Sequence, residues 1–349
     1  MATTAVYPSG TNTFQPSIEA SNKLIVDFSR NIKDFALNQW AQVIPVKKNV
    51  GLYVLMTVEQ AGRILNTDGA DFAWPDGQNA PDNNDGTEKF EFPSYTTKRK
   101  QFGFNLGNLS VDQAAWDILA QHGRISAQQA MTMRTQRAVT VATTSGSYAA
   151  ANTSAVASIT GNTGKWDVST TARNDIQRSL HHAADVIRLG TLGAVKDTDL
   201  HLVMSPGCAR KIRVSQEITD YIKGSAQATA QVRGELPGKN VTYGLPDRLF
   251  GYDVVIEDAV KVTSRKGATK VTSYVLADDT PFMASRVGAL VSETEGPTFS
   301  TLSLFMLEEM TVESEQDKWN RLHKARVVED YDAVLTAPVS GFLFTSAVT

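Results

Sequence analysis

Hydrophobic positions recur with a helical period in the first half of the chain and with a strand-like period toward its C-terminus. Helical spacing over residues 18–37 predicts a segment with one apolar face, which needs a surface to lie on. The same spacing predicts one long helix at about 126–144 and another at 175–189. The apolar face of the first segment includes Leu24, Phe28, Ile32 and Phe35.

Other segments show the alternation or the short apolar runs that are typical of strands. Apolar side chains occupy every second position over residues 50–58. The segment with Phe102, Phe104 and Leu106 is predicted to pair with it as an antiparallel strand. Two helix starts are predicted by capping-box spacing, at Ser110 with Gln113 and at Ser126 with Gln129, and Ser205–Pro206 predicts a helix through residue 222. Further strands are predicted at residues 200–204, 252–259, 273–278, 302–313, 326–335 and 339–344.

A long hairpin that projects from its domain follows from the segment between two of these strands. Residues 66–86 are rich in Asp, Asn, Gly and Pro, so they can hardly bury themselves. The strand that follows carries Lys98 and Lys100 on the same face as Phe102 to Leu106, so this face changes from cationic to apolar. We therefore expect an apolar base within the domain and an outer half that is stabilised on another molecule.

Length and composition agree with a large folded protein. The 349 residues exceed the roughly 250 to 300 that one compact core usually holds, so two domains or long excursions are expected. The chain is 42% hydrophobic and 20% charged, with 34 basic and 37 acidic residues. This balance creates no global field that would favour a polyanion. We find neither the basic and apolar regions of a signal peptide nor an apolar run of about 18 residues that could span a membrane.

Segments that resemble nucleotide or metal motifs fail on spacing. The stretch GNTGK at 161–165 lacks the spacing between glycines and the following Ser or Thr of a phosphate loop, so we interpret it as a plain loop. The acidic residues of DNNDG at 82–86 miss the positions that a calcium loop requires. His181 and His182 are adjacent on a predicted helix and point in different directions, which disfavours a shared metal.

The sequence also shows no recognisable set of catalytic residues. Cys208, the single cysteine, excludes an intrachain disulfide and lies in a predicted first helical turn, where His201 or His323 could in principle activate it. Without a local signature we interpret it as a buried, inert thiol. The carboxylates Glu308, Glu309, Glu313 and Glu315 fit a charged strand face. The sequence therefore predicts no catalytic, cofactor-binding or metal-binding residues, and no cofactor.

The basic triplet Lys98, Arg99 and Lys100 is short, and strand alternation places Arg99 opposite its neighbours. A nucleic-acid contact would require support from a basic field, which the composition does not supply. We therefore predict that the triplet contacts an acidic surface of another subunit.

The order of these parts resembles that of the major capsid proteins of tailed bacteriophages, which share the Hong Kong ninety-seven-like shell fold. The features that carry the resemblance are an apolar N-terminal arm, a long hairpin, a long helix, a helix-strand-helix middle and a strand-rich end, VSGFLFTSAV. The resemblance covers essentially the whole chain and implies an α+β fold. The implied parts are an N-arm at 1–45, an extended E-loop at 46–108, a peripheral domain at 109–170 and 280–349 with its spine helix at about 126–144, and an axial domain at 171–279.

The resemblance also implies a function. We expect a structural protein that self-assembles from hexamers and pentamers into an icosahedral shell, or virion capsid, enclosing double-stranded DNA through nonspecific contacts. Its partners would be many copies of itself, a portal, a separate scaffolding protein and a decoration protein, with no membrane contact and with assembly in the host bacterial cytoplasm. The arm-like region begins almost at Met1, so we expect the mature chain to start at Met1 or Ala2.

The alternatives are an encapsulin-type compartment of the same fold, an intracellular α/β enzyme and a nucleic-acid-binding module. An encapsulin-type compartment would enclose a cargo protein, whereas a phage shell would enclose double-stranded DNA. A pocket with converging titratable groups would favour the enzyme, and strong, salt-dependent DNA affinity of the isolated subunit would favour the module. The candidate subunit-interface residues are Lys98, Arg99, Lys100, Leu24, Phe28, Ile32 and Phe35.

Overall fold

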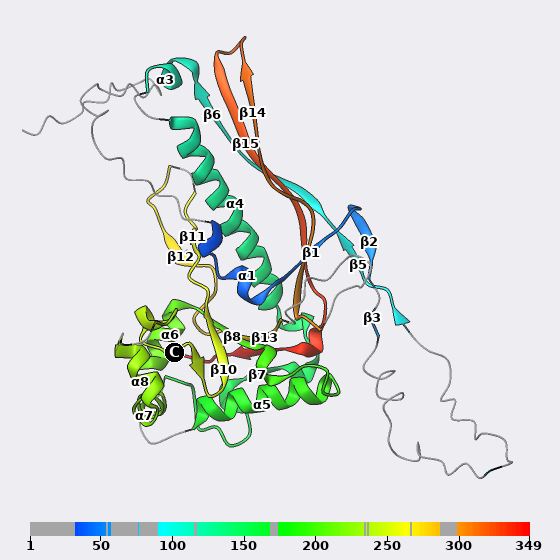
Figure 1. Cartoon of the computed structure of the whole chain (residues 1–349), viewed down its shortest axis with the longest axis vertical. Coiled ribbons are helices and arrows are strands. Elements are labelled where there is room, and N and C mark those ends of the chain that lie inside the picture. Colours follow the sequence, from blue (N-terminus) through cyan, green and yellow to red (C-terminus); the bar gives the residue numbers. More distant parts are fainter. Residues whose placement is uncertain are drawn as a thin grey trace, which may run out of the picture. The chain divides into compact units, whose positions relative to one another are not determined.

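The computed structural model shows an α+β chain that divides into two compact units (Figure 1). The first unit takes in residues 1–35, 98–134 and 308–331, and the second takes in residues 36–97, 135–307 and 332–349. These limits differ from the predicted domain boundaries, which stay a prediction. The structure describes residues 32–53, 55–56, 76, 90–114, 117–167, 174–233, 235, 237–265, 267–286 and 299–349.

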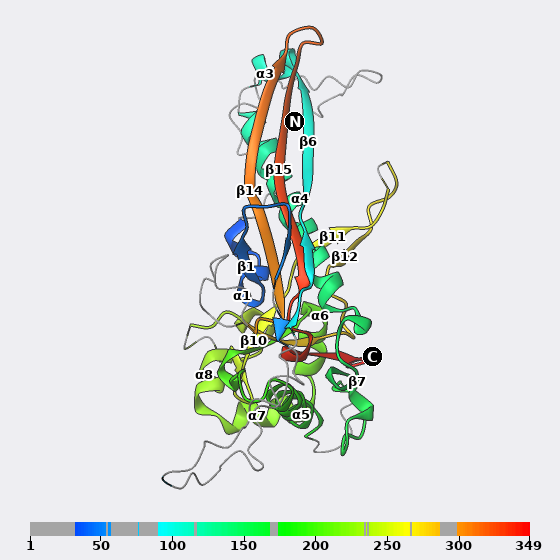
Figure 2. The ribbon, with the colours of Figure 1, turned by 90° about the vertical axis from the view of Figure 1, so that its right-hand side faces the viewer.

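The first unit contains a three-stranded antiparallel arrangement along a long helix. Strand β6 (Lys98–Gly107) pairs over its whole length with the outer part of β15 (Leu322–Leu335), from Tyr331 opposite Lys98 to Leu322 opposite Gly107. The outer part of β14 (Leu302–Asp317) follows on the other side of β15 (Figure 2). Helix α4 (Ile118–Ala142) contacts β6 through His122, whose ring centroid lies 5.3 Å from that of Phe104.

The predicted partner of β6 was wrong. Phe102, Phe104 and Leu106 lie opposite residues of β15, not opposite residues 50–58. Residues 50–58 instead contribute two short strands to one arm of a separate hairpin. β2 (Val50–Leu52) pairs with β5 (Ser94–Thr96), and β3 (Leu55–Met56) pairs with β4 (Phe90–Glu91). The prediction paired β6 with a strand that lies near it in the sequence. Its true partner, β15, pairs with it over ten residues but lies more than 200 residues away in the sequence.

An aromatic stack anchors the base of this hairpin in the second unit. The ring of Phe305 on β14 stacks against Tyr95 at 4.3 Å and against Tyr53 at 5.6 Å between centroids. β1 (Gln42–Pro45) runs parallel to the inner part of β14 beside this stack. The base of the hairpin is therefore apolar, as predicted, but different residues supply it.

A six-stranded mixed sheet forms the centre of the second unit, in the order β7-β16-β13-β8-β10-β9. β8 pairs parallel with β10 and antiparallel with β13. Helix α5 (Asp175–Gly190) packs on the sheet with Ile176, Leu180, Ala183 and Ile187 in the core, which confirms the predicted helix and its buried face (Figure 1). The strands are β7 (Thr153–Ala155), β8 (Leu200–Met204), β9 (Arg248–Leu249), β10 (Tyr252–Ile256), β13 (Phe282–Ser285) and β16 (Gly341–Thr345).

Both capping-box predictions were wrong. α4 begins at Ile118, where Asp117 Oδ1 accepts a hydrogen bond from the Ala120 amide at 2.9 Å, and Ser126 lies buried within the helix. Ser110 lies inside the short helix α3 (Asn108–Asp112). The spacing of Ser126 and Gln129 resembles a capping box, but such a spacing can also occur inside a helix. In α4 the cap is supplied by Asp117 instead.

Ser205 is the predicted N-cap of the next helix, and its Oγ accepts the Cys208 amide at 3.0 Å. The predicted single helix through residue 222 is two helices, because Ser215 starts a second one. The remaining helices and strands are α6 (Pro206–Arg213), α7 (Gln216–Gly224), α8 (Ala226–Arg233), α1 (Leu37–Trp40), β11 (Val260–Val262) and β12 (Thr272–Tyr274). No helix in the described ranges is long and apolar enough to cross a membrane.

Candidate functional site

The basic triplet lies at the start of β6, where Lys98, Arg99 and Lys100 face Tyr331, Asp330 and Glu329 in the strand register. Lys98 and Arg99 are exposed, whereas Lys100 is partly buried. The Arg99 guanidinium lies 3.8 Å from Glu308, with 70% of the Arg99 side chain exposed, so water screens this ion pair. Their contact with another subunit stays a prediction.

Lys100 has partners within its own chain. Its Nζ donates a 2.6 Å hydrogen bond to the Tyr331 carbonyl and lies 3.4 Å from the centroid of the Tyr331 ring. An ammonium over an aromatic face is a favourable cation-π contact. Lys100 therefore packs within its own subunit, and its predicted contact with another subunit stays a prediction.

A buried ion pair lies close to this contact. Arg134 on α4 is bound to Glu329 on β15, with Nε 3.1 Å from Oε2, and the side chains are 9% and 0% exposed. The Arg134 guanidinium also lies 5.4 Å from the centroid of the Tyr331 ring. Sequence reasoning missed this pair, although Arg134 stood on a helix face made of small apolar residues. A cation on such a face indicates a buried acidic partner, because a buried charge is costly unless it is paired.

The predicted arm contacts are only partly covered by the structure. Leu24 and Phe28 lie outside the described residues, and Ile32 begins a short 3-10 helix that ends at Asp34. Phe35 is 2% exposed, so this chain already buries it. The proposed contact of the arm with another subunit stays a prediction.

Trp40, which the sequence reasoning did not select, fixes the start of the second unit. Its indole Nε1 donates a 3.2 Å hydrogen bond to Glu257 Oε2, and both side chains are fully buried. Its ring packs edge-on against Phe282 at 5.1 Å. A tryptophan at the end of an apolar segment was the available signal, because buried indole N–H groups usually have an acceptor.

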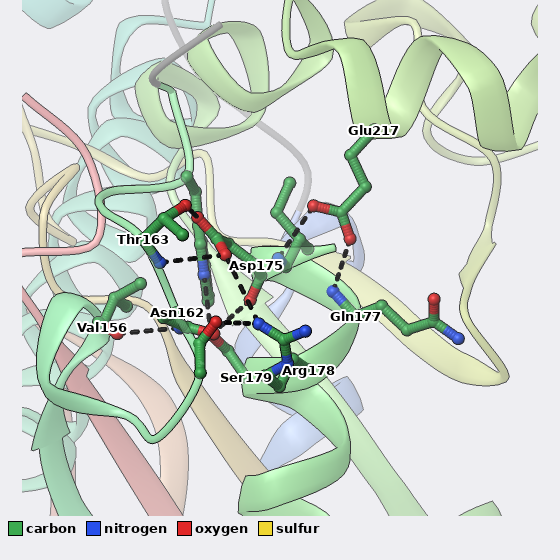
Figure 3. Close-up of polar contacts among 11 residues, drawn as sticks. Val156, Asn162, Thr163, Asp175, Gln177, Arg178, Ser179 and Glu217 are labelled. Atoms are coloured by element: carbon green, nitrogen blue, oxygen red, sulfur yellow. Dashed lines mark hydrogen bonds and ion pairs between the residues drawn. The ribbon is translucent and has the colours of Figure 1, made fainter. Parts of the chain in front are cut away.

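The GNTGK stretch is tied into the second unit by its own side chains (Figure 3). Asn162 Nδ2 donates to the Val156 carbonyl and to Ser179 Oγ, both at 2.8 Å. Thr163 donates from its amide and its hydroxyl to Asp175 at 3.2 and 2.8 Å. These polar groups are used to hold the loop.

The nearby N-terminus of α5 already has an anion. Glu217 accepts hydrogen bonds from the amides of Ile176 and Gln177 at 2.9 and 2.7 Å (Figure 3). Burial raises the pKa of Glu217, while these two amide bonds act in the opposite direction. A carboxylate thus occupies the position that a phosphate would take. Residues 161–165 do form a loop, and their interpretation as a plain loop rather than a nucleotide site stays a prediction.

The candidate catalytic groups are not brought together. Cys208 is fully buried, as predicted, and burial raises the pKa of its thiol. His201 lies 4.0 Å from Asp253, and burial lowers its pKa. Both line a cleft of about 380 Å³ in the second unit, together with Gln39, Lys239, Asp247, Val254, Val255 and Arg286. This lining includes no cysteine or hydroxyl side chain.

The other candidates have structural partners. His181 and His182 face different rings, those of Tyr252 and Phe342. Among the described residues no group of three or more His, Cys, Asp or Glu side chains could hold a metal ion. The β14 glutamates behave as a charged strand face, and Glu313, for example, binds Arg326 at 2.6 Å.

Comparison with known proteins shows similarity in structure alone. No family model matches the sequence, and no curated protein matches it. A phage-related protein from Bordetella bronchiseptica RB50 matches with a TM-score of 0.61 at 12% identity, covering 90% of this chain and 93% of that one. The capsid structure of cyanophage P-SCSP1u matches with a TM-score of 0.58 at 10% identity, covering 94% and 92%.

A third match extends the same result. The mature capsid of bacteriophage PhiM1 gives a TM-score of 0.53 at 11% identity and covers 96% of this chain and 91% of that one. At sequence identities this low, the matches show similarity of fold alone. The coverage shows that this similarity extends over nearly the full length of each chain. The chain therefore has the Hong Kong ninety-seven-like fold of tailed-phage capsid proteins.

Proposed function

We propose that this chain is the major capsid protein of a tailed bacteriophage, which assembles from hexamers and pentamers into an icosahedral shell around double-stranded DNA. The observation that carries the proposal is the full-length structural match to two phage capsids, at TM-scores of 0.58 and 0.53.

The physical basis of assembly would be many modest contacts. A shell joins each subunit to several neighbours, so weak interfaces add through multivalency. The exposed Lys98 and Arg99 on β6 supply one such contact, directed at an acidic surface of a neighbour. The remaining partners that we propose are a portal, a separate scaffolding protein and a decoration protein, with assembly in the host cytoplasm.

Sedimentation velocity of the purified full-length chain tests the proposal. We expect pentamers, hexamers or larger particles whose share rises with protein concentration. A chain that remains a monomer at high concentration would refute a shell-forming role. An encapsulin-type shell would give particles too, but these would hold protein cargo instead of double-stranded DNA when isolated from their native host.

A further inference from the structure

The hairpin of β11 and β12 concentrates positive charge. Residues 259–277 include four basic residues, Lys261, Arg265, Lys266 and Lys270, and no acidic residue. The whole chain has a net charge of −3, so this excess is local. Salt screens charges over about 8 Å at physiological ionic strength, so the hairpin's own cations dominate the potential around it.

The hairpin is a separate two-stranded ribbon. Among the described strands, β11 and β12 pair only with each other. The ribbon extends away from the six-stranded sheet (Figure 2). Between residues 262 and 273 every described residue is exposed except Ser264, which is partly buried. The strands and the turn of this ribbon are therefore open to a partner.

The cations of the ribbon have no partners within the described part of the chain. Lys261 is partly buried, and Arg265 and Lys270 are exposed. No hydrogen bond or ion pair among the described residues engages these three side chains. Arg99 and Arg326 in the first unit, by contrast, lie beside carboxylates of their own chain. The charges of the ribbon are thus available to an anion from outside the chain.

The turn that carries Arg265 has a defined shape. The Thr263 amide donates to the Val271 carbonyl at 2.9 Å, and the Val271 amide donates to Ser264 Oγ at 3.2 Å. The Ala268 amide donates to the Arg265 carbonyl at 3.1 Å. Because these bonds already hold the backbone, little further ordering opposes binding at the turn.

The polar side chains beside the cations suit an oxyanion. Thr269, Thr272 and Ser273 are exposed, and no described residue binds their hydroxyl groups. Hydroxyl groups of Ser and Thr, together with Lys and Arg, supply many of the hydrogen bonds that proteins make to phosphate oxygens. Cations and hydroxyl donors thus occur together along the ribbon.

The composition of the ribbon fits nucleic acid better than an acidic protein. Protein interfaces are depleted in lysine, and buried Trp, Tyr and Arg side chains supply most of their binding energy. Three of the four cations here are lysines, and the one aromatic residue of the ribbon, Tyr274, is partly buried. The exposed Val260, Val262 and Val271 are small side chains of a kind that is common on protein surfaces. Double-stranded DNA presents a continuous array of phosphates, and its major groove admits a two-stranded β-ribbon.

We propose that the β11–β12 ribbon binds the phosphate backbone of double-stranded DNA. Lys261, Arg265 and Lys270 lie against phosphate oxygens in this contact, and the neighbouring hydroxyl groups donate hydrogen bonds to them. Phosphate contacts carry no sequence information, so the binding is independent of sequence. The inference rests on the proposed function for the source of the DNA, because it names the part of the chain that meets the DNA inside the shell.

The salt dependence of DNA binding tests the ribbon. Binding to phosphates releases counterions, so each cation removed from the contact lowers the slope of log affinity against log salt concentration by about one. We expect the unassembled full-length chain to bind a short DNA duplex of arbitrary sequence, as measured by fluorescence anisotropy. The variant Arg265→Ala/Lys270→Ala should lower the slope by about two. Both positions are exposed and without described partners, so the circular dichroism spectrum should not change.

The matched control is Lys98→Ala/Arg99→Ala, which removes two exposed cations from the first unit and should leave the slope unchanged. Equal loss of slope from both variants, or no measurable DNA binding by the unmodified chain, would overturn the ribbon site. Loss of assembly in Arg265→Ala/Lys270→Ala with unchanged DNA binding would overturn it too, and would assign the ribbon to an acidic protein surface. Absence of particles from the unmodified chain would refute the shell alone, because the slopes are measured on unassembled chains.

Discussion

The buried pair of Arg134 and Glu329 is the sharpest energetic feature at the scale of single residues. Each charge has left water, and the two charges compensate each other. Removing one partner leaves a buried charge, whereas removing both leaves none. The pair therefore fixes α4 to β15 in a single arrangement within the first unit.

We predict that Arg134→Leu lowers the free energy of unfolding by about 3 to 5 kcal/mol, the usual cost of breaking a buried pair from one side. The double variant Arg134→Leu/Glu329→Leu should lose less. The matched control is Arg326→Leu, because the Arg326–Glu313 pair is 52% and 48% exposed and should contribute at most about 1 kcal/mol. Urea denaturation of the subunit measures all three, and equal losses from both single variants would contradict the account.

The three basic residues of β6 separate into two roles. Lys98 and Arg99 are exposed, so Lys98→Glu/Arg99→Glu should leave the circular dichroism spectrum unchanged and weaken assembly. Lys100→Glu should destabilise the subunit itself, because it places a carboxylate over the Tyr331 ring and opposite Glu329. Sedimentation of the double variant decides the interface role. Normal particles would remove Lys98 and Arg99 from the interface.

At the scale of elements, buried faces were predictable and pairings were not. The buried face of α5 follows from local periodicity, and the strand at 200–204 follows from its short apolar run. The partner of β6 lies on β15, and an alternating pattern does not specify which distant strand it meets. The start of α4 was missed because Asp117 supplies the cap nine residues before Ser126, the predicted signal.

The cap of α5 gives a prediction with a defined sign. Burial raises the pKa of Glu217 above the usual value of a glutamate side chain, so the folded chain holds this proton more tightly than the unfolded chain. Stability from this group is present below the unfolded pKa and is lost as pH rises through the folded pKa.

We therefore expect the stability of the natural chain relative to Glu217→Gln to fall as pH rises above the usual pKa of a glutamate side chain. Urea midpoints at several pH values measure this difference, and the exposed Glu235→Gln variant controls for the lost charge. A relative stability that instead rises with pH would show that the two amide hydrogen bonds outweigh burial.

For the whole molecule, the order of elements carried more information than any short motif. Identities of 10 to 12% with the matched structures leave few shared residues, yet those structures and this chain align over at least 90% of their lengths. The long helix and the strand-rich end were readable because the first follows a helical hydrophobic period and the second a strand-like one. Trp40–Glu257 and the Phe305 stack were not readable, because they depend on contacts between segments far apart in sequence.

Electron microscopy of the purified, negatively stained full-length chain tests the central claim most directly. The claim requires that these subunits close on themselves, so the predicted result is a population of uniform, closed particles with icosahedral outlines, accompanied by free pentamers or hexamers. Fields that contain only small single subunits, even at high protein concentration, would contradict a capsid role for this chain.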